Sequence, residues 1–289
     1  MRLALGSAQF GMHYGISNET GQVGLIEIKR ILSECEKAGI DLIDTAISYG
    51  DSERVLGQTG VQQFRIVTKI PGVPDGTENV ATWVRREVEG SLDRLKVPHL
   101  YGLLMHQSAM LLQSNAYQVV QAMQDLKKAG IVQKLGMSLY NPCELNNVKR
   151  LFKPDLVQLP LNVLDRRFEE RGWLKILCSE GVEIHSRSSF LQGLLLMKRT
   201  DIPSKFGRWR LVWDSWHSYL DATGVKACAA CLNYPLNLPE VDRVVVGVTS
   251  AAQLIELLRD TKNSTGFEQW PGLANVDQRL INPSLWARL

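Results

Sequence analysis

The sequence predicts an α/β protein, a single (β/α)8 TIM barrel, and three observations support this fold class. Short apolar runs of strand length alternate with helix-like segments along the chain. Three of these segments end in a glycine, at Gly39, Gly130 and Gly181, and a strand-like run follows each one directly. Glycine is favoured just beyond a helix C-terminus. Because no linker rich in Pro, Gly and Ser divides the 289 residues, we expect one domain over residues 1–289, with residues 266–289 as a C-terminal tail.

Eight apolar runs are expected to form the barrel strands. Near-continuous apolar strands that alternate with helices are typical of a parallel sheet covered on both faces. The alternative is an open doubly wound sheet, whose first strand is followed by the spacing G-x-G-x-x-G. The glycines Gly6, Gly11 and Gly15 do not match that spacing. In chain order, the expected strands are Leu3–Leu5, Ile40–Asp44, Arg65–Lys69, Tyr101–His106, Lys134–Ser138, Leu156–Leu159, Glu183–Ser186 and Arg243–Gly247.

Helices are expected between these strands, because apolar residues recur there at steps of three and four. In Leu25–Ala38, for example, Ile28, Ile31 and Cys35 lie on one helical face. The same periodicity runs through Asn79–Leu95. Two further helix-like stretches are Val225–Leu232 and Ala251–Leu258.

The composition is that of an ordinary globular protein and excludes several classes. Apolar residues make up 45%, charged residues 22%, and the formal net charge is +3, so we expect neither a disordered chain nor a nucleic-acid-binding arm. No apolar stretch approaches the roughly 18 residues of a membrane span, and the N-terminus lacks a signal-peptide core. The five cysteines are scattered, which favours the reducing cytoplasm. Cys228 and Cys231 have redox spacing, but we interpret them as packing residues within a helix.

Polar side chains at the carboxyl ends of the expected strands indicate a site for proton transfer. Asp44 ends the second strand, with Tyr49 shortly after it, while Lys69 ends the third and His106 the fourth. Chemistry in such barrels lies at these strand ends. A lysine ammonium lowers the pKa of a neighbouring phenol, an aspartate can hold the lysine, and a neutral histidine can orient a carbonyl. Each residue alone has an ordinary structural role, but their joint placement indicates protonation of a carbonyl oxygen.

These residues resemble the active site of the aldo-keto reductase family, and the chain looks most like its bacterial members. Residues 42–50, with Asp44 and Tyr49, resemble the family segment D-T-A-x-x-Y-G, and Lys69 and His106 fall where the family has its lysine and histidine. The similarity covers nearly the whole chain. It implies hydride transfer between NADP(H) and a carbonyl or alcohol, since no side chain supplies a hydride. Tyr49 would be the general acid, tuned by Lys69 and Asp44.

The resemblance also implies a set of cofactor-binding residues. Gly136–Ser138 and Gln158–Asn162 resemble the stretches that hold the nicotinamide carboxamide, although Leu139 replaces a frequent asparagine. Arg187 stands where an aromatic residue commonly stacks on the nicotinamide. A guanidinium can also stack there, which would favour the reduced ring, or it can turn toward a carboxylate. The expected cofactor-binding residues are Ser7, Asp44, Ser138, Gln158, Arg187, Ser188, Phe190, Gln192, Gly193, Leu194, Gly247, Thr249, Ser250, Gln253 and Glu256.

The segment after the last strand bears on the choice of nucleotide. Residues 247–256 resemble the family's adenosine-phosphate loop and helix start, where backbone N–H groups bind phosphate. Many relatives have an arginine for the ribose 2′-phosphate where this chain has Thr249, and Leu257 replaces a frequent asparagine. The resemblance still favours NADP(H), with NAD(H) as the alternative.

The expected partner is a small-molecule carbonyl substrate, an aldehyde, aldose or nucleotide sugar, rather than nucleic acid or a membrane. The pocket walls are expected from Met12–Tyr14, the loop after His106, and Met197–Arg210. The last segment carries five basic residues, which either attract an acidic substrate or are simply solvated. His185 is a further candidate for the barrel mouth. The oligomeric state is left open.

Three alternative functions are considered. Thr249 motivates an NAD-dependent sugar dehydrogenase. A cofactor-binding regulatory subunit with vestigial activity would keep the same fold. A metal-dependent hydrolase or isomerase would need several His and carboxylate ligands at strand ends, where only Asp44 and His106 are available, so no metal ligands are expected.

Overall fold

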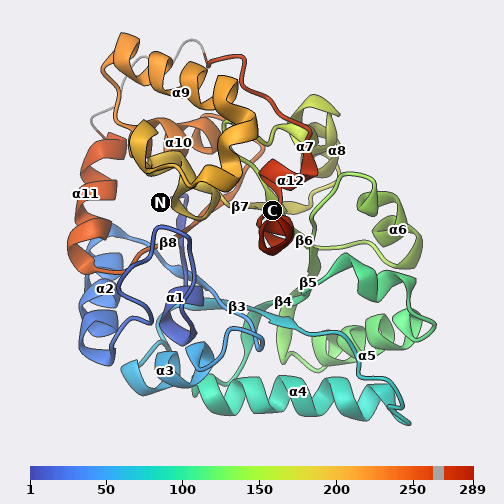
Figure 1. The fold of residues 1–289 in the computed structure, drawn as a ribbon. Coiled ribbons are helices and arrows are strands. Elements are labelled where there is room, and N and C mark those ends of the chain that lie inside the picture. The colour runs from blue at the N-terminus through green and yellow to red at the C-terminus, as the bar shows by residue number, and fades with distance from the viewer. Residues whose placement is uncertain (263–269) are drawn as a thin grey trace.

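Eight parallel strands close into a barrel in the computed structural model, which describes residues 1–262 and 270–289 (Figure 1). Each strand pairs with the next along the chain, and β8 returns to pair with β1. The predicted (β/α)8 fold and all eight expected strands are therefore confirmed. The strands are β1 (Leu3–Gly6), β2 (Leu42–Asp44), β3 (Arg65–Ile70), β4 (Leu100–Met105), β5 (Val132–Ser138), β6 (Leu156–Pro160), β7 (Glu183–Arg187) and β8 (Arg243–Gly247).

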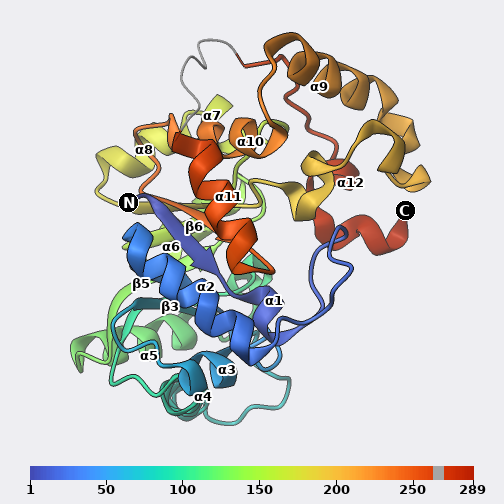
Figure 2. The ribbon, with the colours of Figure 1, turned by 90° about the vertical axis from the view of Figure 1, so that its left-hand side faces the viewer.

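Helices surround the barrel and connect its strands (Figures 1 and 2). The α-helices are α1 (Ala8–Gly11), α2 (Leu25–Ala38), α3 (Ser52–Thr59), α4 (Val80–Leu95), α5 (Ala116–Lys128), α6 (Glu144–Leu151), α7 (Arg167–Glu170), α8 (Trp173–Ser179), α9 (Arg210–Thr223), α10 (Ala227–Leu236), α11 (Ala251–Lys262) and α12 (Gln278–Ile281). Short 3-10 helices are η1 (Ser108–Leu112), η2 (Leu191–Leu196), η3 (Arg199–Asp201), η4 (Ser204–Trp209) and η5 (Pro283–Arg288). No helix among residues 1–262 and 270–289 is long and apolar enough to cross a membrane.

The apolar core has two parts, as a barrel covered by helices requires. A large cluster fills the space between the outer face of the sheet and the helices. A second cluster joins side chains of five different strands, where they meet in the barrel interior. Burial on both faces explains why the strands read as near-continuous apolar runs. The members of the second cluster are Ala4, Leu42, Val67, Leu104 and Leu156.

Several strands extend one or two residues beyond the expected bounds, and two boundaries fall inside them. β2 begins at Leu42 rather than Ile40, because Gly39 adopts a left-handed conformation (φ 72°) and the Ile40 N–H closes α2 by donating to the Cys35 carbonyl (2.9 Å). β4 ends one residue earlier than expected, so His106 is the first residue beyond it. The first of these differences follows from a hydrogen bond that apolar patterning does not reveal.

The C-terminal segment lies on the same side of the barrel as the loop after β1 (Figure 2). Residues 266–269 of the expected tail lie outside the described residues. Farther on, the Trp286 ring packs edge-on against Phe206 of η4, with centroids 4.8 Å apart. The Trp286 indole N–H donates to the Leu280 carbonyl at 3.0 Å. The end of the chain is therefore packed on the segment that follows β7.

Cys228 and Cys231 both lie inside α10, as the sequence suggested. Cys231 is fully buried, and burial raises the pKa of the Cys228 thiol to about 12. Neither thiol is therefore primed for redox chemistry, in agreement with their interpretation as packing residues.

Candidate active site

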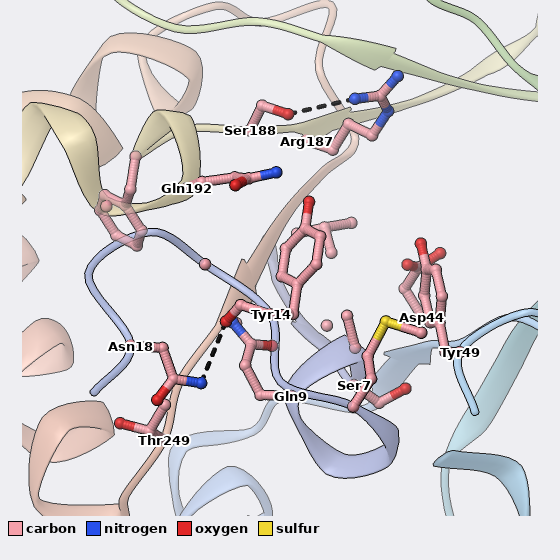
Figure 3. A pocket seen from close by; sticks show the side chains of 18 of the residues that line it. Ser7, Gln9, Tyr14, Asn18, Asp44, Tyr49, Arg187, Ser188, Gln192 and Thr249 are labelled. Atoms are coloured by element: carbon pink, nitrogen blue, oxygen red, sulfur yellow. Dashed lines mark hydrogen bonds between the residues drawn. The ribbon is translucent and has the colours of Figure 1, made fainter. Parts of the chain in front are cut away.

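One cavity of about 550 Å³ opens where the carboxyl ends of the strands meet (Figure 3). Its walls come from the ends of seven strands and the loops after them. Register brings these ends together: Gly6 pairs with Asp44 on one side and with Gly247 on the other. Among the predicted site residues, those that line the cavity are Ser7, Asp44, Tyr49, His106, Ser138, Gln158, Arg187, Ser188, Phe190, Gln192, Gly193, Gly247, Thr249 and Gln253.

Lys69 is fully buried below the cavity and links two of the predicted catalytic residues. Its ammonium lies 2.7 Å from both carboxylate oxygens of Asp44 and 2.9 Å from the carbonyl oxygen of Thr45. It also donates to the Tyr49 hydroxyl at 3.3 Å. Since a buried charge is tolerated only when it is paired, Asp44 keeps Lys69 next to the phenol.

A tight turn after β2 presents Tyr49 to the cavity. The Tyr49 N–H donates to the Ala46 carbonyl at 3.0 Å. Gly50 follows with a left-handed φ of 56°, and a Cβ at this position would lie 2.4 Å from the Gly11 carbonyl oxygen. Any larger residue would push this turn away from α1. The glycine that ends the D-T-A-x-x-Y-G segment therefore serves to place the tyrosine.

His106 completes the predicted tetrad. Its ring meets the ring of Tyr49 edge-on, with centroids 5.5 Å apart. Burial, assisted by the nearby positive charge of Lys69, lowers the pKa of His106 to about 4. The imidazole is therefore neutral at ordinary pH, as expected for a group that donates a hydrogen bond to a carbonyl.

The lowered pKa of His106 predicts a pH-dependent contribution to stability. In the unfolded chain this histidine binds a proton near pH 6.5, but in the folded protein only near pH 4. The unfolded state is therefore favoured as the pH falls through this window. Between pH 7.5 and 5, His106→Asn should lose about 2 kcal/mol less stability than the wild type, measured by urea unfolding. The exposed His99→Asn should behave like the wild type, and equal pH dependence in all three proteins would contradict this account.

Tyr49 departs from expectation in the direction of its pKa shift. Burial, with the charge of Asp44 adding to it, raises the pKa of Tyr49 above its usual value, while the charge of Arg187 opposes the shift. The expected lowering of the Tyr49 pKa is therefore wrong. The physical reason is that Asp44 offsets the Lys69 charge, so desolvation of the phenolate prevails. The phenol consequently carries its proton throughout the neutral pH range.

Polar side chains from β5, β6 and β1 form the floor of the cavity beside the tetrad. The Gln158 amide nitrogen donates to Asp44 at 2.7 Å, which gives that carboxylate a third hydrogen bond. Ser138 pairs with Gln158 in register, and both are buried. Ser7 accepts a hydrogen bond from the Ser52 hydroxyl at 2.7 Å. Gln158 is thus held by the carboxylate of the tetrad, and Ser7 joins it through its N–H, which donates to the Asp44 carbonyl at 3.0 Å.

Arg187 is fixed at the cavity wall by three contacts, none of them with a carboxylate. Its guanidinium carbon lies 4.4 Å from the centroid of the Tyr140 ring. One nitrogen donates to the Leu139 carbonyl at 2.9 Å and another to the Ser188 hydroxyl at 3.2 Å (Figure 3). The alternative in which Arg187 turns toward a carboxylate is therefore wrong for the part of the chain that the structure describes.

Tyr140, on which Arg187 packs, is held in place by hydrogen bonds of its own backbone groups. Its N–H donates to Glu144 at 2.8 Å, and its carbonyl accepts from Arg167 at 3.0 Å. Arg167 is in turn paired with the buried Asp165 at 2.7 Å. The Arg187 guanidinium at the cavity wall therefore packs on an aromatic ring whose backbone is fixed by hydrogen bonds.

The loop after β7 meets the loop after β1 at the cavity. Gln192 and Gly193 both have left-handed backbone conformations. The Gln192 carbonyl accepts from the Ile16 N–H at 3.1 Å, and a Cβ on Gly193 would lie 1.8 Å from the Ser17 hydroxyl. Only glycine permits this approach, so the two loops bridge one side of the cavity. Leu194, also predicted to bind cofactor, is buried in the core instead.

The start of α11 forms the other end of the cavity. Thr249 and Gln253 line it, and a Cβ on Gly247 would lie 2.5 Å from the Gln9 amide. Two predicted residues of this segment are not part of the cavity wall. Ser250 accepts from the Gln253 N–H at 3.1 Å and so supports the helix start, while Glu256 lies 3.7 Å from both Lys226 and Arg259.

The five basic residues of 197–210 do not line the cavity. Arg199 and Arg210 both pair with Asp214, at 3.1 and 3.4 Å. Lys205 donates to the Trp286 carbonyl at 3.2 Å. The expectation of a positive substrate mouth built by this segment is thus not met, because α9 supplies a carboxylate that the local sequence pattern did not connect to it.

Two cavity residues, Gln9 and Tyr140, were not expected from the sequence. Met12 and Tyr14 of the expected segment Met12–Tyr14 do line the cavity, and Tyr14 stands in the centre of the view between Gln9 and Arg187 (Figure 3). Tyr140 lies two residues beyond the end of β5, so the strand-end rule could have found it. His185 does not line the cavity: it is fully buried and its Nε2 lies 2.7 Å from Glu183.

The residues present fit a nicotinamide dinucleotide. The cavity volume of about 550 Å³ is typical of small-molecule sites, and the wall runs from the tetrad past Arg187 to the start of α11. Hydroxyl and amide side chains dominate the wall, as a ligand with carboxamide, ribose and phosphate groups requires. Among the described residues there is no group of three or more His, Cys, Asp or Glu arranged to hold a metal ion.

The fold and the site together define a barrel oxidoreductase, and comparison with known proteins identifies its family. The model of the aldo/keto reductase family matches residues 2–270, so the chain belongs to the aldo/keto reductase family. It is an NAD(P)-dependent oxidoreductase of the barrel type.

Three relatives illustrate the similarity. The chain is 24% identical over 249 residues to the uncharacterized oxidoreductase YqkF of Bacillus subtilis (strain 168), covering 78% of this chain and 79% of that protein. It is 23% identical over 280 residues to L-galactose dehydrogenase of Arabidopsis thaliana, covering 88% and 82%. Among solved structures, aldo-keto reductase AKR11C1 from Bacillus halodurans (holo form) superposes with a TM-score of 0.74 at 19% identity, covering 96% and 94%.

Proposed function

We propose that this chain reduces the carbonyl group of a small molecule with a reduced nicotinamide nucleotide, and that Tyr49 is the general acid. One observation carries the proposal: Lys69 bridges Asp44 and the Tyr49 hydroxyl, beside a neutral His106, at the wall of a single cavity. A phenol that holds its proton and an adjacent buried ammonium suit the protonation of a developing alkoxide.

The residues divide the work as follows. A nicotinamide cofactor bound in the cavity supplies the hydride. Tyr49 donates its proton to the carbonyl oxygen, and the ammonium of Lys69, 3.3 Å away, stabilises the phenolate that remains. Asp44 keeps Lys69 protonated despite its burial, which by itself lowers the pKa of the amine. His106 donates a hydrogen bond that orients the carbonyl before proton transfer.

The cofactor would be held along the wall described above. Ser138 and Gln158 suit the nicotinamide carboxamide, the segment Ser188–Gly193 suits the central phosphates, and Thr249 and Gln253 suit the adenosine end. The family resemblance favours NADP(H), whereas Thr249, in place of an arginine, favours NAD(H).

Arg187 predicts a preference for the reduced cofactor. A guanidinium fixed on Tyr140 next to the nicotinamide is compatible with the neutral reduced ring but repels the positively charged oxidised ring. Arg187→Ala should therefore narrow the affinity gap between the two redox forms by about tenfold. Tryptophan fluorescence titration with each form measures this gap. If Arg187→Ala showed the same affinity difference between the reduced and oxidised nucleotides as the wild type, Arg187 would have no role in redox-state preference.

The substrate class is proposed from the shape of the site and from the relatives. An aldehyde, an aldose or a nucleotide sugar remains our proposal, and the similarity to a protein named L-galactose dehydrogenase supports a sugar. An NAD-dependent sugar dehydrogenase, working in the direction of oxidation, is the second candidate, and Thr249 favours it. A regulatory subunit with vestigial activity would bind nucleotide but show no turnover.

Turnover distinguishes these candidates. The oxidation of NADH or NADPH is followed by absorbance with a panel of simple aldehydes, aldoses and nucleotide sugars, and the reverse reaction with the corresponding alcohols. Carbonyl-dependent oxidation of the nucleotide supports the reductase, and faster turnover of sugars in reverse supports the dehydrogenase. Nucleotide binding without turnover of any compound would favour the regulatory subunit.

We also propose a cytoplasmic location and a single folding unit. The location rests on the five cysteines, all of which are free thiols in the structure. The single unit rests on the continuous apolar cluster that extends from Leu3 to Trp286.

A further inference from the structure

The backbone N–H groups at the junction of β8 and α11 already donate hydrogen bonds to side chains of the protein. The Thr249 N–H donates to the side-chain oxygen of Gln253 at 2.7 Å, and the Gln253 N–H donates to the Ser250 hydroxyl at 3.1 Å. The N–H of Ala251, the first residue of α11, donates to the carboxylate of Glu27 at 2.8 Å. Three donors that could bind a phosphate are thus already used by the protein.

Glu27 comes from a different part of the chain. It lies in the first turn of α2, which runs beside α11 in both views of the fold (Figures 1 and 2). The hydrogen bond from Ala251 lowers the pKa of Glu27, and Arg30 at 3.2 Å adds to the effect. The carboxylate is therefore ionised at neutral pH and places a negative charge at the N-terminus of α11, where the helix dipole attracts anions.

We propose that Glu27 is a specificity-determining residue that makes this chain select NAD(H) over NADP(H). The cavity reaches the loop through Thr249 and Gln253. Thr249 lies on the opposite side of the cavity from Tyr49 (Figure 3). The two nucleotides differ only at the ribose 2′ position, which is a hydroxyl in NAD(H) and a phosphate in NADP(H). An acidic side chain accepts a hydrogen bond from the hydroxyl but repels the phosphate.

The positive charges near this loop do not reverse that preference. The position at which relatives carry an arginine is Thr249, which offers a hydroxyl and no charge. Arg30, the cation in contact with Glu27, has a side chain that is 68% exposed, against 28% for Glu27, so water screens its charge more strongly than that of the carboxylate. Selectivity then arises mainly from repulsion of the phosphorylated nucleotide, which is a common way to build specificity.

The inference rests on the proposed function, because it requires a nicotinamide nucleotide in the cavity, and a binding titration tests it without turnover. NADH and NADPH are titrated separately against the wild type, Glu27→Gln and Glu34→Gln, with quenching of tryptophan fluorescence as the readout. Glutamine keeps a side-chain oxygen for the Ala251 N–H but removes the charge. Glu34 is a matched control, because it lies on the same helix and pairs with Lys37 at 2.6 Å.

The wild type should bind NADH at least about tenfold more tightly than NADPH. Glu27→Gln should lower this ratio about tenfold, mainly through tighter NADPH binding, while its NADH affinity changes by no more than about threefold. Glu34→Gln should keep the wild-type ratio. Thermal melting followed by circular dichroism confirms that all three proteins are folded.

Three outcomes would overturn the inference, and they differ in what else they affect. Equal affinity of the wild type for the two nucleotides, or equal effects of Glu27→Gln and Glu34→Gln on the ratio, would refute the role of Glu27 and leave the proposed function intact. Failure of both nucleotides to bind below millimolar concentration would remove the proposed function together with this inference.

Discussion

Tyr49→Phe should reduce the rate of carbonyl reduction by a factor of about a hundred to ten thousand, while nucleotide binding stays within about twofold. The variant keeps the ring that meets His106 edge-on and loses only the hydroxyl that accepts a hydrogen bond from Lys69. A proton donor is then missing at the point where the alkoxide forms. Turnover is measured at saturating nucleotide with the aldehyde that the wild type reduces fastest, and nucleotide affinity by fluorescence.

Tyr117→Phe provides the matched control for this experiment. Tyr117 is 66% exposed on the outer helix α5, far from the cavity wall, and removal of its hydroxyl should change neither rate nor affinity. An unchanged rate in Tyr49→Phe would contradict the assignment of the general acid. If Tyr49→Phe lost nucleotide affinity as well as rate, Tyr49 would instead have a role in nucleotide binding.

Asp44→Asn should destabilise the protein by about 3 kcal/mol and also remove activity. Both side chains of the Asp44–Lys69 pair are almost completely buried, so the variant leaves the ammonium without a counter-charge. Because burial lowers the pKa of Lys69 when the carboxylate no longer opposes it, the amine loses its proton more readily and can no longer stabilise a Tyr49 phenolate. Urea unfolding at pH 7 measures the stability.

Two further variants separate stability from catalysis. Asp51→Asn removes an exposed carboxylate that pairs with Arg54 and should cost less than about 1 kcal/mol. Asp44→Asn combined with Lys69→Met should recover part of the lost stability, because no charge is left buried, but none of the activity. Equal stability of Asp44→Asn and Asp51→Asn would contradict the claim that the buried Asp44–Lys69 pair stabilises the folded protein.

The barrel and the tetrad could be predicted from the sequence because both depend on strands. Apolar runs that alternate with helical segments located all eight strands, and parallel strands bring their carboxyl ends to one face. Asp44 and Lys69 are strand residues, and His106 directly follows a strand, so their meeting follows from topology alone. Tyr49 needed the turn at Gly50 in addition, and the local D-T-A-x-x-Y-G pattern supplied that information.

The remainder of the site depends on contacts between distant loops, which periodicity does not encode. Arg187 packs on Tyr140 because β5 and β7 end on the same face, and Glu27 reaches Ala251 because α2 and α11 are neighbours. The basic residues of 197–210 looked like a substrate mouth until Asp214, one turn into α9, proved to pair with two of them. The shift in the pKa of Tyr49 was predicted in the wrong direction, because the sequence shows the neighbouring charges but not how deeply the phenol is buried.

Transfer of a labelled hydride tests the central claim most directly. The protein is mixed with an aldehyde that it reduces and with NADH or NADPH carrying deuterium at carbon 4 of the nicotinamide, on each face in turn. Mass spectrometry of the alcohol should find one deuterium on the former carbonyl carbon for one of the two faces, at a rate that Tyr49→Phe lowers. Formation of alcohol without deuterium from either face, or no alcohol from any carbonyl of the panel despite nucleotide binding, would contradict the account.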